Sequence, residues 1–297
     1  MAAPQFSIVI PTYNYAHFLE RSVISAISQR DASFEVLVVD DGSTDNTAQV
    51  IEEILQRQPS SFRFIRQENR GPAAARANGA SQAQGTWLLF LDADDELLPE
   101  ALSIFSNEIS GSPDARVLLA AHQSISDKGT SLVLPGPLSA SRKDNFTRYL
   151  EKKIRFSNGA SIVHRSALAR VNFCEDLRHT EDIPVFAQLL ACNDAIAVDQ
   201  PVLRVHKHSG SRRHNHEAAL ALGMELVDRI FDNELPDWAQ QYRNKYVARR
   251  ALSLARLANQ ARRKKTARHF YHIAFRADWR LSLKPRHLRV FLKSLFS

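Results

Sequence analysis

Residues 87–96 read WLLFLDADDE, an apolar run that is followed at once by a cluster of carboxylates. Carboxylates this close together repel one another and raise each other's pKa unless a cation lies among them. Hard oxygen ligands of this kind suit Mg²⁺ or Mn²⁺, and such an ion is often shared with substrate phosphates. The alternative interpretation is a solvated acidic turn before a helix, because Pro99 and Glu100 are typical of a helix start.

Strands and helices alternate around this run through the first third of the chain. Apolar runs predict further strands at Phe6–Ile10, Phe34–Val39 and Phe62–Ile65. Helices are predicted between them, over 17–29, from the caps at 43–45 to about 58, and over 72–84. This alternation predicts a mostly parallel, doubly wound sheet with helices on both faces. In such sheets ligands bind beyond the carboxyl ends of the strands, where the acidic cluster lies.

The remaining two thirds divide into a less regular middle and a helical end. Strands are predicted at 117–121 and 160–164, a loop with one short helix over 124–158, a helix at 183–191 and two short strands within 195–206. The pattern is helical from Glu217 onward, over 217–231, 238–259, 264–277 and 285–296. We therefore expect a domain over 1–212 and a basic helical region over 213–297.

Composition places the chain among ordinary globular proteins, with 44% hydrophobic and 24% charged residues. The two cysteines, Cys174 and Cys192, do not form a zinc pattern and do not suggest a disulfide framework. No leader segment is evident, and no apolar run approaches the ~18 residues of a membrane span. These features predict a cytoplasmic protein in a reducing compartment.

The positive charge is concentrated at the end of the chain. The net charge is +7, yet residues 241–297 hold 16 Lys and Arg against a single acid, Asp278. Three interpretations of this basic tail stay open. It contacts an anionic membrane peripherally, on the inner face of the plasma membrane; it binds nucleic acid; or it is a helical lid with solvated bases. No nucleic-acid-binding motif is evident, so nucleic acid is not expected as a partner.

Three segments carry the residues suited to chemistry: SIVIPTYN at 7–14, VVDDGSTD at 38–45 and LDADD at 91–95. Their order closely resembles the family 2 glycosyltransferases, which have the GT-A fold. The stretches NRGPAAARANG at 69–79 and TED at 180–182 resemble further motifs of that family. The resemblance covers about residues 5–210 and implies an inverting enzyme that uses a nucleotide-sugar donor.

The resemblance implies that the donor contacts Pro11, Thr12 and Tyr13. The ring of Tyr13 could stack on the nucleobase, although a packed structural tyrosine is an equal alternative. Asp40 could accept a hydrogen bond from the imino group of uracil or thymine, which favours a pyrimidine donor. Arg76 would lie near the base or the phosphates, and a solvated helix face is its alternative.

The resemblance also implies a divalent ion, Mg²⁺ or Mn²⁺, that bridges the diphosphate and stabilises its charge as it leaves. Asp94 is the expected direct ligand, and Asp92 is expected to contact the ribose or the metal. Asp95 is expected to support these ligands rather than to bind the metal itself. His206 could touch the metal or the diphosphate. A single histidine is usually structural, which is the alternative for His206.

Transfer to an alcohol also needs a general base, and a single in-line displacement with inversion needs only one. Asp182 is the predicted base, with Glu181 as the alternative. A capping role for Thr180 before a helix at Ile183 is the competing interpretation of this segment.

The sequence thus predicts an α/β protein with a GT-A-type sheet and a C-terminal helical region. Its predicted function is metal-dependent transfer of a sugar from a UDP- or dTDP-linked donor to a carbohydrate or lipid-linked acceptor. Bacterial surface polysaccharide or lipopolysaccharide synthesis is the expected setting. The alternatives are a catalytically silent nucleotide-sugar-binding or scaffold protein, a nucleic-acid-binding protein, and a nucleotidyltransferase, which would need a glycine-rich phosphate loop.

Overall fold

The computed structural model describes residues 4–59, 61–171, 173–177, 180–207, 216–231 and 234–295. The backbone divides into two compact units, Met1–Ser209 and Gly210–Ser297. Each unit has its own hydrophobic core. The first holds all the residues expected to carry chemistry.

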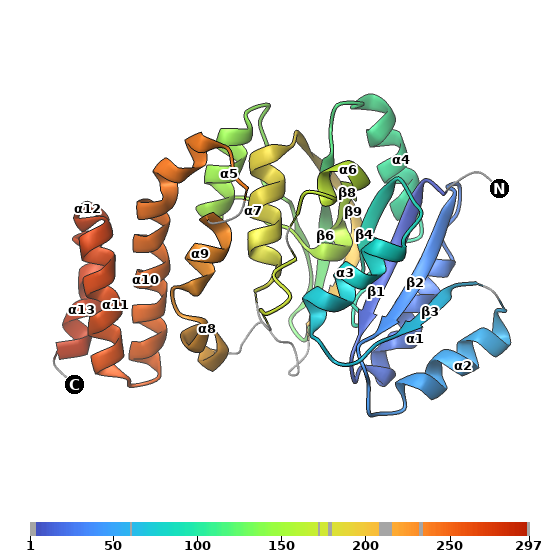
Figure 1. The fold of residues 1–297 in the computed structure, drawn as a ribbon, viewed down its shortest axis with the longest axis horizontal. Helices are drawn as coiled ribbons and strands as arrows, with labels where there is room; N and C mark the ends of the chain where they lie inside the picture. Colours follow the sequence, from blue (N-terminus) through green and yellow to red (C-terminus); the bar gives the residue numbers. More distant parts are fainter. Residues whose placement is uncertain are drawn as a thin grey trace. The chain divides into compact units, whose positions relative to one another are not determined.

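The first unit is built on one nine-stranded sheet in the order β3-β2-β1-β4-β8-β6-β9-β5, with β7 paired to β6 (Figure 1). The strands are β1 Phe6–Thr12, β2 Phe34–Asp40, β3 Arg63–Arg66, β4 Trp87–Phe90, β5 Glu96–Leu97, β6 Val117–Ser126, β7 Gly129–Val133, β8 Ser161–His164 and β9 Ala195–His206. The first four strands pair in parallel, whereas β8, β7 and β5 add antiparallel pairs. The parallel half therefore brings the ends of β2, β1 and β4 to one edge.

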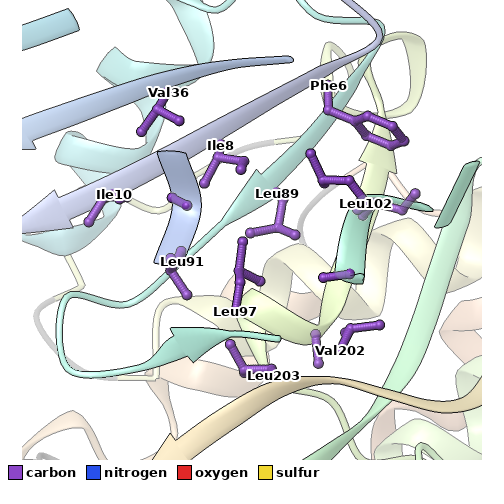
Figure 2. Packing of buried hydrophobic residues seen from close by; sticks show 14 of the residues in the cluster. Phe6, Ile8, Ile10, Val36, Leu89, Leu91, Leu97, Leu102, Val202 and Leu203 are labelled. Carbon is purple, nitrogen blue, oxygen red and sulfur yellow. The ribbon is translucent and has the colours of Figure 1, made fainter. Parts of the chain in front are cut away.

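Apolar side chains on both faces of the central strands explain why these strands are continuous hydrophobic runs. On one face Phe6, Ile8 and Leu89 are fully buried in the main core (Figure 2). Helices that contribute to this core are α1 Ala16–Ile27, α2 Thr47–Arg57 and α4 Ala101–Gly111. The other helices of the unit are α3 Pro72–Gln82, α5 Arg142–Leu150, α6 Arg165–Leu168 and α7 Asp182–Cys192, with the short turn η1 Asn158–Ala160.

Helix α3 lies directly on β1 and β2 because Gly79 faces them without a side chain. A Cβ atom at this position would be 2.3 Å from Cγ1 of Val9 and 3.2 Å from Cγ2 of Val39. Contacts this short would force the helix or the strands to shift. Gly79 therefore allows α3 to pack closely on the sheet. The same helix carries Arg76, which lies one turn earlier on the same side.

The second unit is helical. Its elements are α8 His216–Leu222, α9 Glu225–Phe231, η3 Asp237–Tyr242, α10 Arg243–Gln260, α11 Lys264–Ala277, α12 Trp279–Ser282 and α13 Pro285–Leu295. Alanine and leucine side chains of α10 pack against α11, and the ring of Tyr271 stacks on Phe291 with centroids 4.7 Å apart. Within the described ranges, no helix is both long and apolar enough to cross a bilayer.

The predicted α/β class with a helical C-terminal region is confirmed, and several boundaries differ. The segment 124–158, expected to be mainly loop, contains the end of β6 and the whole of β7. Residues 195–206 form one strand rather than two. The helix expected over 217–231 is divided at Gly223, whose φ of 53° breaks the helix.

Strand β1 also continues through Pro11, where the sequence predicted its end. Its pairing with β4 stops at Val9, opposite Phe90. Pro11 is therefore tolerated, because a proline lacks the N–H that a fully paired central strand would use.

Candidate active site

The ends of β1 and β2 form a small polar cradle around Asp40. In the parallel register Thr12 lies opposite Asp40, and the Asp40 side chain is fully buried. Its Oδ1 accepts a hydrogen bond of 2.9 Å from the backbone N–H of Ser43. Its Oδ2 lies 3.5 Å from Nε of Arg66 but, among the described residues, accepts no hydrogen bond, and the buried hydroxyl of Thr12 has no partner there either. Buried polar atoms are normally satisfied, so this pair is suited to receive a ligand.

The loop after β1 is fastened to the loop after β2 through Asn14. Its side-chain oxygen accepts a hydrogen bond of 2.8 Å from the N–H of Thr44, and its own N–H donates to Oγ of Ser43 at 2.9 Å. Asn14 adopts a φ of 55°, a conformation that asparagine tolerates better than most residues. Neighbouring Tyr13 is half-buried, and its ring has no aromatic partner in the described part of the chain. The ring is therefore available for stacking.

Asp41 has a structural role. Its carboxylate accepts hydrogen bonds from the side chain of Gln67 at 2.8 Å and from the backbone N–H groups of Arg70 at 2.9 Å and Gly71 at 2.8 Å. Gly71 has a φ of 97°, a conformation that residues with a side chain rarely adopt. Asp41 thus holds the loop that leads into α3.

Arg76 lies between two carboxylates that are far apart in the sequence. Its Nη2 donates to Oδ1 of Asp92 at 2.8 Å, and its Nη1 donates to Oε1 of Glu181 at 2.7 Å. Burial alone would lower the pKa of Arg76, but these two carboxylates more than offset it and raise the pKa. Arg76 is buried, so its alternative interpretation as part of a solvated helix face is wrong. Its position near the base or the phosphates stays a prediction, and Arg76 joins the strand-end acidic cluster to the segment 180–182.

Asp182 begins α7 beside this ion-pair network and differs from Glu181 in its partners. Within the described residues its carboxylate accepts no hydrogen bond from another residue. Burial and the neighbouring charge of Glu181 raise the pKa of Asp182 to about 6, although Arg76 opposes the shift. A carboxyl with a pKa near neutrality is suited to take up a proton during a reaction. Thr180, the competing capping residue, has a φ of 59°, and α7 has no side-chain cap.

The acidic cluster after β4 is tied to the end of β9. Asp95 is buried and accepts a hydrogen bond of 3.1 Å from the backbone N–H of His206. The His206 ring lies 3.3 Å from Oε2 of Glu96, and Arg204 pairs with Oε1 of the same residue at 3.1 Å. Burial and the nearby cation of Arg21 lower the pKa of His206, although the hydrogen bond to Glu96 opposes the shift.

A metal ion at this edge would need ligands beyond the protein. Within the described ranges, His, Cys, Asp and Glu side chains do not form a group of three that could hold an ion. Asp94, Asp92 and His206, the predicted ligands, are therefore not gathered into one ready-made site. Mg²⁺ is commonly bound by one or two carboxylates together with substrate phosphates. Two carboxylates, at Asp92 and Asp94, follow one strand end, and this donor set fits an ion whose coordination a diphosphate completes.

A pocket opens beside the carboxylates, bounded by α3, α7, β4 and β8. Its volume is about 380 Å³ when the solvent-open space at its mouth is included. Most of its wall is apolar, formed chiefly by Phe90, Val163, Leu168, Phe173, Phe186 and Leu189. The polar lining residues are Arg76, Asn158, Glu181 and Asp182.

Sequence reasoning found most of this edge but missed some of its residues. Glu96 was counted in the acidic cluster without a role, yet it pairs with both Arg204 and His206. The signal was weak, because β5 is only two residues long and pairs with a distant strand. The apolar pocket wall gave no signal at all, since each of its residues reads as ordinary core.

We predict that Asp182→Asn raises stability at alkaline pH. Because the pKa of Asp182 is raised from 3.8 to about 6 in the folded state, its ionisation destabilises the fold as pH rises through that window. The variant should exceed the parent by up to about 3 kcal/mol at pH 8, and the difference should vanish below pH ~4. Urea unfolding of the parent and the variant at the two pH values measures this difference in free energy.

Glu181→Gln is the matched control. It removes one charge that pairs with buried Arg76, so we expect it to lower the free energy of unfolding at pH 8 by about 1–3 kcal/mol. A less stable Asp182→Asn variant at pH 8 would mean that the ionised carboxylate is well satisfied in the fold.

Comparison with known proteins places this geometry in a family. The family described as "Glycosyl transferase family 2" matches residues 7–178. The succinoglycan biosynthesis protein ExoO of Rhizobium meliloti is 26% identical over 279 residues, which cover 89% of this chain and 79% of that protein. A GalNAc(5)-diNAcBac-PP-undecaprenol beta-1,3-glucosyltransferase of Campylobacter jejuni is 37% identical over 102 residues, 34% of this chain.

Some of these likenesses cover only parts of the relatives. The alignments span 33% of the Campylobacter protein and 41% of an uncharacterised glycosyltransferase of Haemophilus influenzae, which is 36% identical over 102 residues, 34% of this chain. Among solved structures, S. aureus TarS 1-349 is 22% identical with a TM-score of 0.66, covering 98% of this chain and 88% of that one. The resemblance and the GT-A fold predicted from the sequence are thus confirmed, and the chain belongs to glycosyltransferase family 2.

Proposed function

We propose that the protein is an inverting, metal-dependent glycosyltransferase that uses a pyrimidine nucleoside-diphosphate sugar. The observation that carries this proposal is the ion-pair network in which Arg76 joins Asp92 to Glu181 beside Asp182. It gathers the acidic cluster suited to a diphosphate and a candidate base at one edge of the sheet. Relatives are named for succinoglycan and minor teichoic acid biosynthesis, which supports a carbohydrate or lipid-linked acceptor in surface polysaccharide synthesis.

The nucleobase would be recognised at the ends of β1 and β2. Oδ2 of Asp40, which accepts no hydrogen bond from the protein, would accept one from the imino N–H of uracil or thymine. The Thr12 hydroxyl would satisfy a second polar atom, and Tyr13 would stack on the ring beside Pro11. A structure of TarS is titled as a complex with UDP-GlcNAc, and one of a Pyrobaculum calidifontis mannosyltransferase with GDP-Man and Mn²⁺. Both base classes thus occur on this fold, and Asp40 favours the pyrimidine.

At the end of β4, Asp94 and Asp92 would hold a divalent ion, with His206 as a further ligand once its ring leaves Glu96. The ion would supply Lewis-acid stabilisation of the charge on the departing diphosphate. Arg76 would keep Asp92 oriented toward that group, because it already fixes Oδ1 of the carboxylate.

Asp182 would take the proton of the attacking acceptor hydroxyl. As this proton moves to the carboxylate, the acceptor oxygen forms a bond to the anomeric carbon of the donor. The bond from that carbon to the diphosphate breaks on the opposite side, so configuration inverts. Glu181 is a weaker candidate because its carboxylate is already paired with Arg76 at 2.7 Å.

Donor binding is expected to depend on both base type and metal. UDP- or dTDP-sugars with Mn²⁺ should raise the melting temperature by several degrees, because a ligand that binds only the folded state stabilises it. Asp40→Asn would present an N–H toward the imino group, and we expect a loss of pyrimidine affinity of ~10–100-fold. Asp94→Ala should abolish the part of this rise in melting temperature that depends on the metal. A thermal-shift panel measures these effects, and equal stabilisation by GDP-sugars would contradict the pyrimidine assignment.

Turnover should separate from donor binding at Asp182. Asp182→Asn is expected to bind the donor like the parent but to release nucleoside diphosphate ~10²–10⁴-fold more slowly, since it cannot accept a proton. The readout is donor hydrolysis, with water as the acceptor. In the parent this rate should fall as pH drops below about 6, the pKa of Asp182. Undiminished hydrolysis by Asp182→Asn would remove it from the role of base.

The second unit supports a peripheral contact with anionic membrane on the cytoplasmic side. Phe275, Trp279 and Leu283 expose 42%, 54% and 46% of their surface near the end of α11 and around α12. A base lies beside these exposed groups, because the guanidinium of Arg280 is 5.4 Å from the centroid of the Trp279 ring. Exposed aromatic groups beside bases are typical of helices that lie in a lipid interface.

This contact is testable with vesicles. The protein should sediment with vesicles containing anionic phosphatidylglycerol, less with pure phosphatidylcholine, and less as salt increases. Trp279→Ser should weaken binding several-fold, whereas Phe64→Ser, at a residue of the first unit that is 38% exposed, should not. Equal binding by the two variants, or binding that ignores lipid charge, would refute the contact.

A further inference from the structure

The sheet order suggests which substrate would fill the pocket beside Asp182. Strands β2, β1, β4 and β8 are consecutive neighbours in the sheet. On the proposed function, the nucleobase lies at β2 and β1 and the diphosphate at the end of β4. The pocket follows next along this line, between β4, β8 and α7, on the side away from the nucleobase. It therefore lies where the partner of the donor would approach.

Asp182 lines the pocket, and this links the pocket to the acceptor. A general base has to lie within hydrogen-bond reach of the proton that it removes. The acceptor hydroxyl must therefore be at the mouth of the pocket, and the sugar that bears this hydroxyl would contact the wall. The room inside the pocket for the centre of a water-sized group is only about 20 Å³, so a substituent the size of a methyl group would enter it while the sugar ring stays at the mouth.

The wall chemistry disfavours a sugar with a hydroxyl group at every carbon. Phe90 and Phe173 meet edge to face with centroids 5.9 Å apart, and Val163 and Leu189 continue the apolar surface. A hydroxyl placed against such a wall loses its hydrogen bonds to water without replacement. A methyl group placed there is stabilised instead.

Two unpartnered N–H donors lie among the polar lining residues. Nε of Arg76 is buried and has no hydrogen-bond partner among the residues that the structure describes. The side-chain amide of Asn158 likewise makes no hydrogen bond within the described part of the chain. Such donors are suited to a carbonyl oxygen, because a buried N–H group without an acceptor is costly. An apolar wall combined with N–H donors matches an acetamido group, which has a methyl and a carbonyl.

We propose that this pocket selects an acceptor sugar that carries an acetamido substituent. This inference rests on the proposed glycosyltransferase function and names the acceptor class for the same site. The methyl group would lie against the wall formed by Val163 and the phenylalanines, and the carbonyl would accept a hydrogen bond from Arg76 or Asn158. The hydroxyl to be glycosylated would then point toward Asp182.

The test compares sugars that differ only in this substituent. Binding of N-acetylglucosamine against glucose, and of N-acetylgalactosamine against galactose, is measured by ligand-observed NMR in the presence of UDP and the diamagnetic ion Mg²⁺. The acetamido sugar of each pair should bind at least about fivefold more tightly. Its methyl protons should receive the strongest saturation transfer from the protein. L-Rhamnose against L-mannose tests a methyl group without a carbonyl and should show a smaller preference.

Val163→Thr probes the wall with a nearly isosteric hydroxyl. It should reduce the acetamido preference several-fold. Val36→Thr makes the same change at a similarly buried residue of β2 outside the pocket, 2% exposed against 3% for Val163, and should leave the preference intact. Thermal melting confirms that both variants are folded, and Val185→Thr on α7 offers a second probe of the pocket lining.

Three results would overturn the proposal. Equal binding of acetamido and plain sugars would show that the wall does not select, and equal effects of the two threonine variants would separate the preference from the pocket. If Val163→Thr weakened UDP-GlcNAc but not free N-acetylglucosamine, the pocket would belong to the donor sugar. Each of these leaves UDP binding intact, whereas loss of UDP binding itself would count against the proposed function.

Discussion

One buried cation holds the candidate active site together. Arg76 donates to Asp92, which follows β4, and to Glu181, which precedes α7. A buried charge is tolerated only when it is paired, so the two carboxylates and the guanidinium stabilise one another's positions. Because both arms of Arg76 are engaged by Asp92 and Glu181, Asp182 is left as the carboxylate without a direct partner. Burial is the main cause of its raised pKa, and the neighbouring charge of Glu181 adds to it.

The topology of the sheet places the candidate site residues along one edge, in the order of the neighbouring strands. Parallel pairing of β2, β1 and β4 brings the segments that follow them to a common edge, and the antiparallel strand β8 extends that edge. Recognition of a base, of a diphosphate and of an acceptor can then be handled by neighbouring strands. Asp41 and Asn14 contribute by fixing the connecting loops. Rigid loops of this kind lower the entropy lost when a ligand is bound.

The sequence predicted the parallel half well, because strands buried on both faces leave continuous apolar runs that are easily recognised. The rule that strand ends bind ligands also predicted Asp40 and Asp92 at one edge, whereas Asp182 was expected only from the family resemblance. The sequence did not predict β7 or the continuity of β9, since these depend on pairing between distant segments rather than on local pattern. The partners of Arg76 and the pocket wall were missed for the same reason. From the sequence alone a buried arginine cannot be distinguished from a solvated one, because its carboxylate partners are distant in the chain.

The absence of a side chain at Gly79 has a consequence for interpreting genetic variation. Any larger residue there would push α3 away from Val9 and Val39, and Arg76 is carried on the same helix one turn earlier. A substitution at Gly79 would thus displace the guanidinium of Arg76. In a mutational screen, replacement of this glycine would mimic the phenotype of damage to the reaction centre while altering no group that touches a substrate.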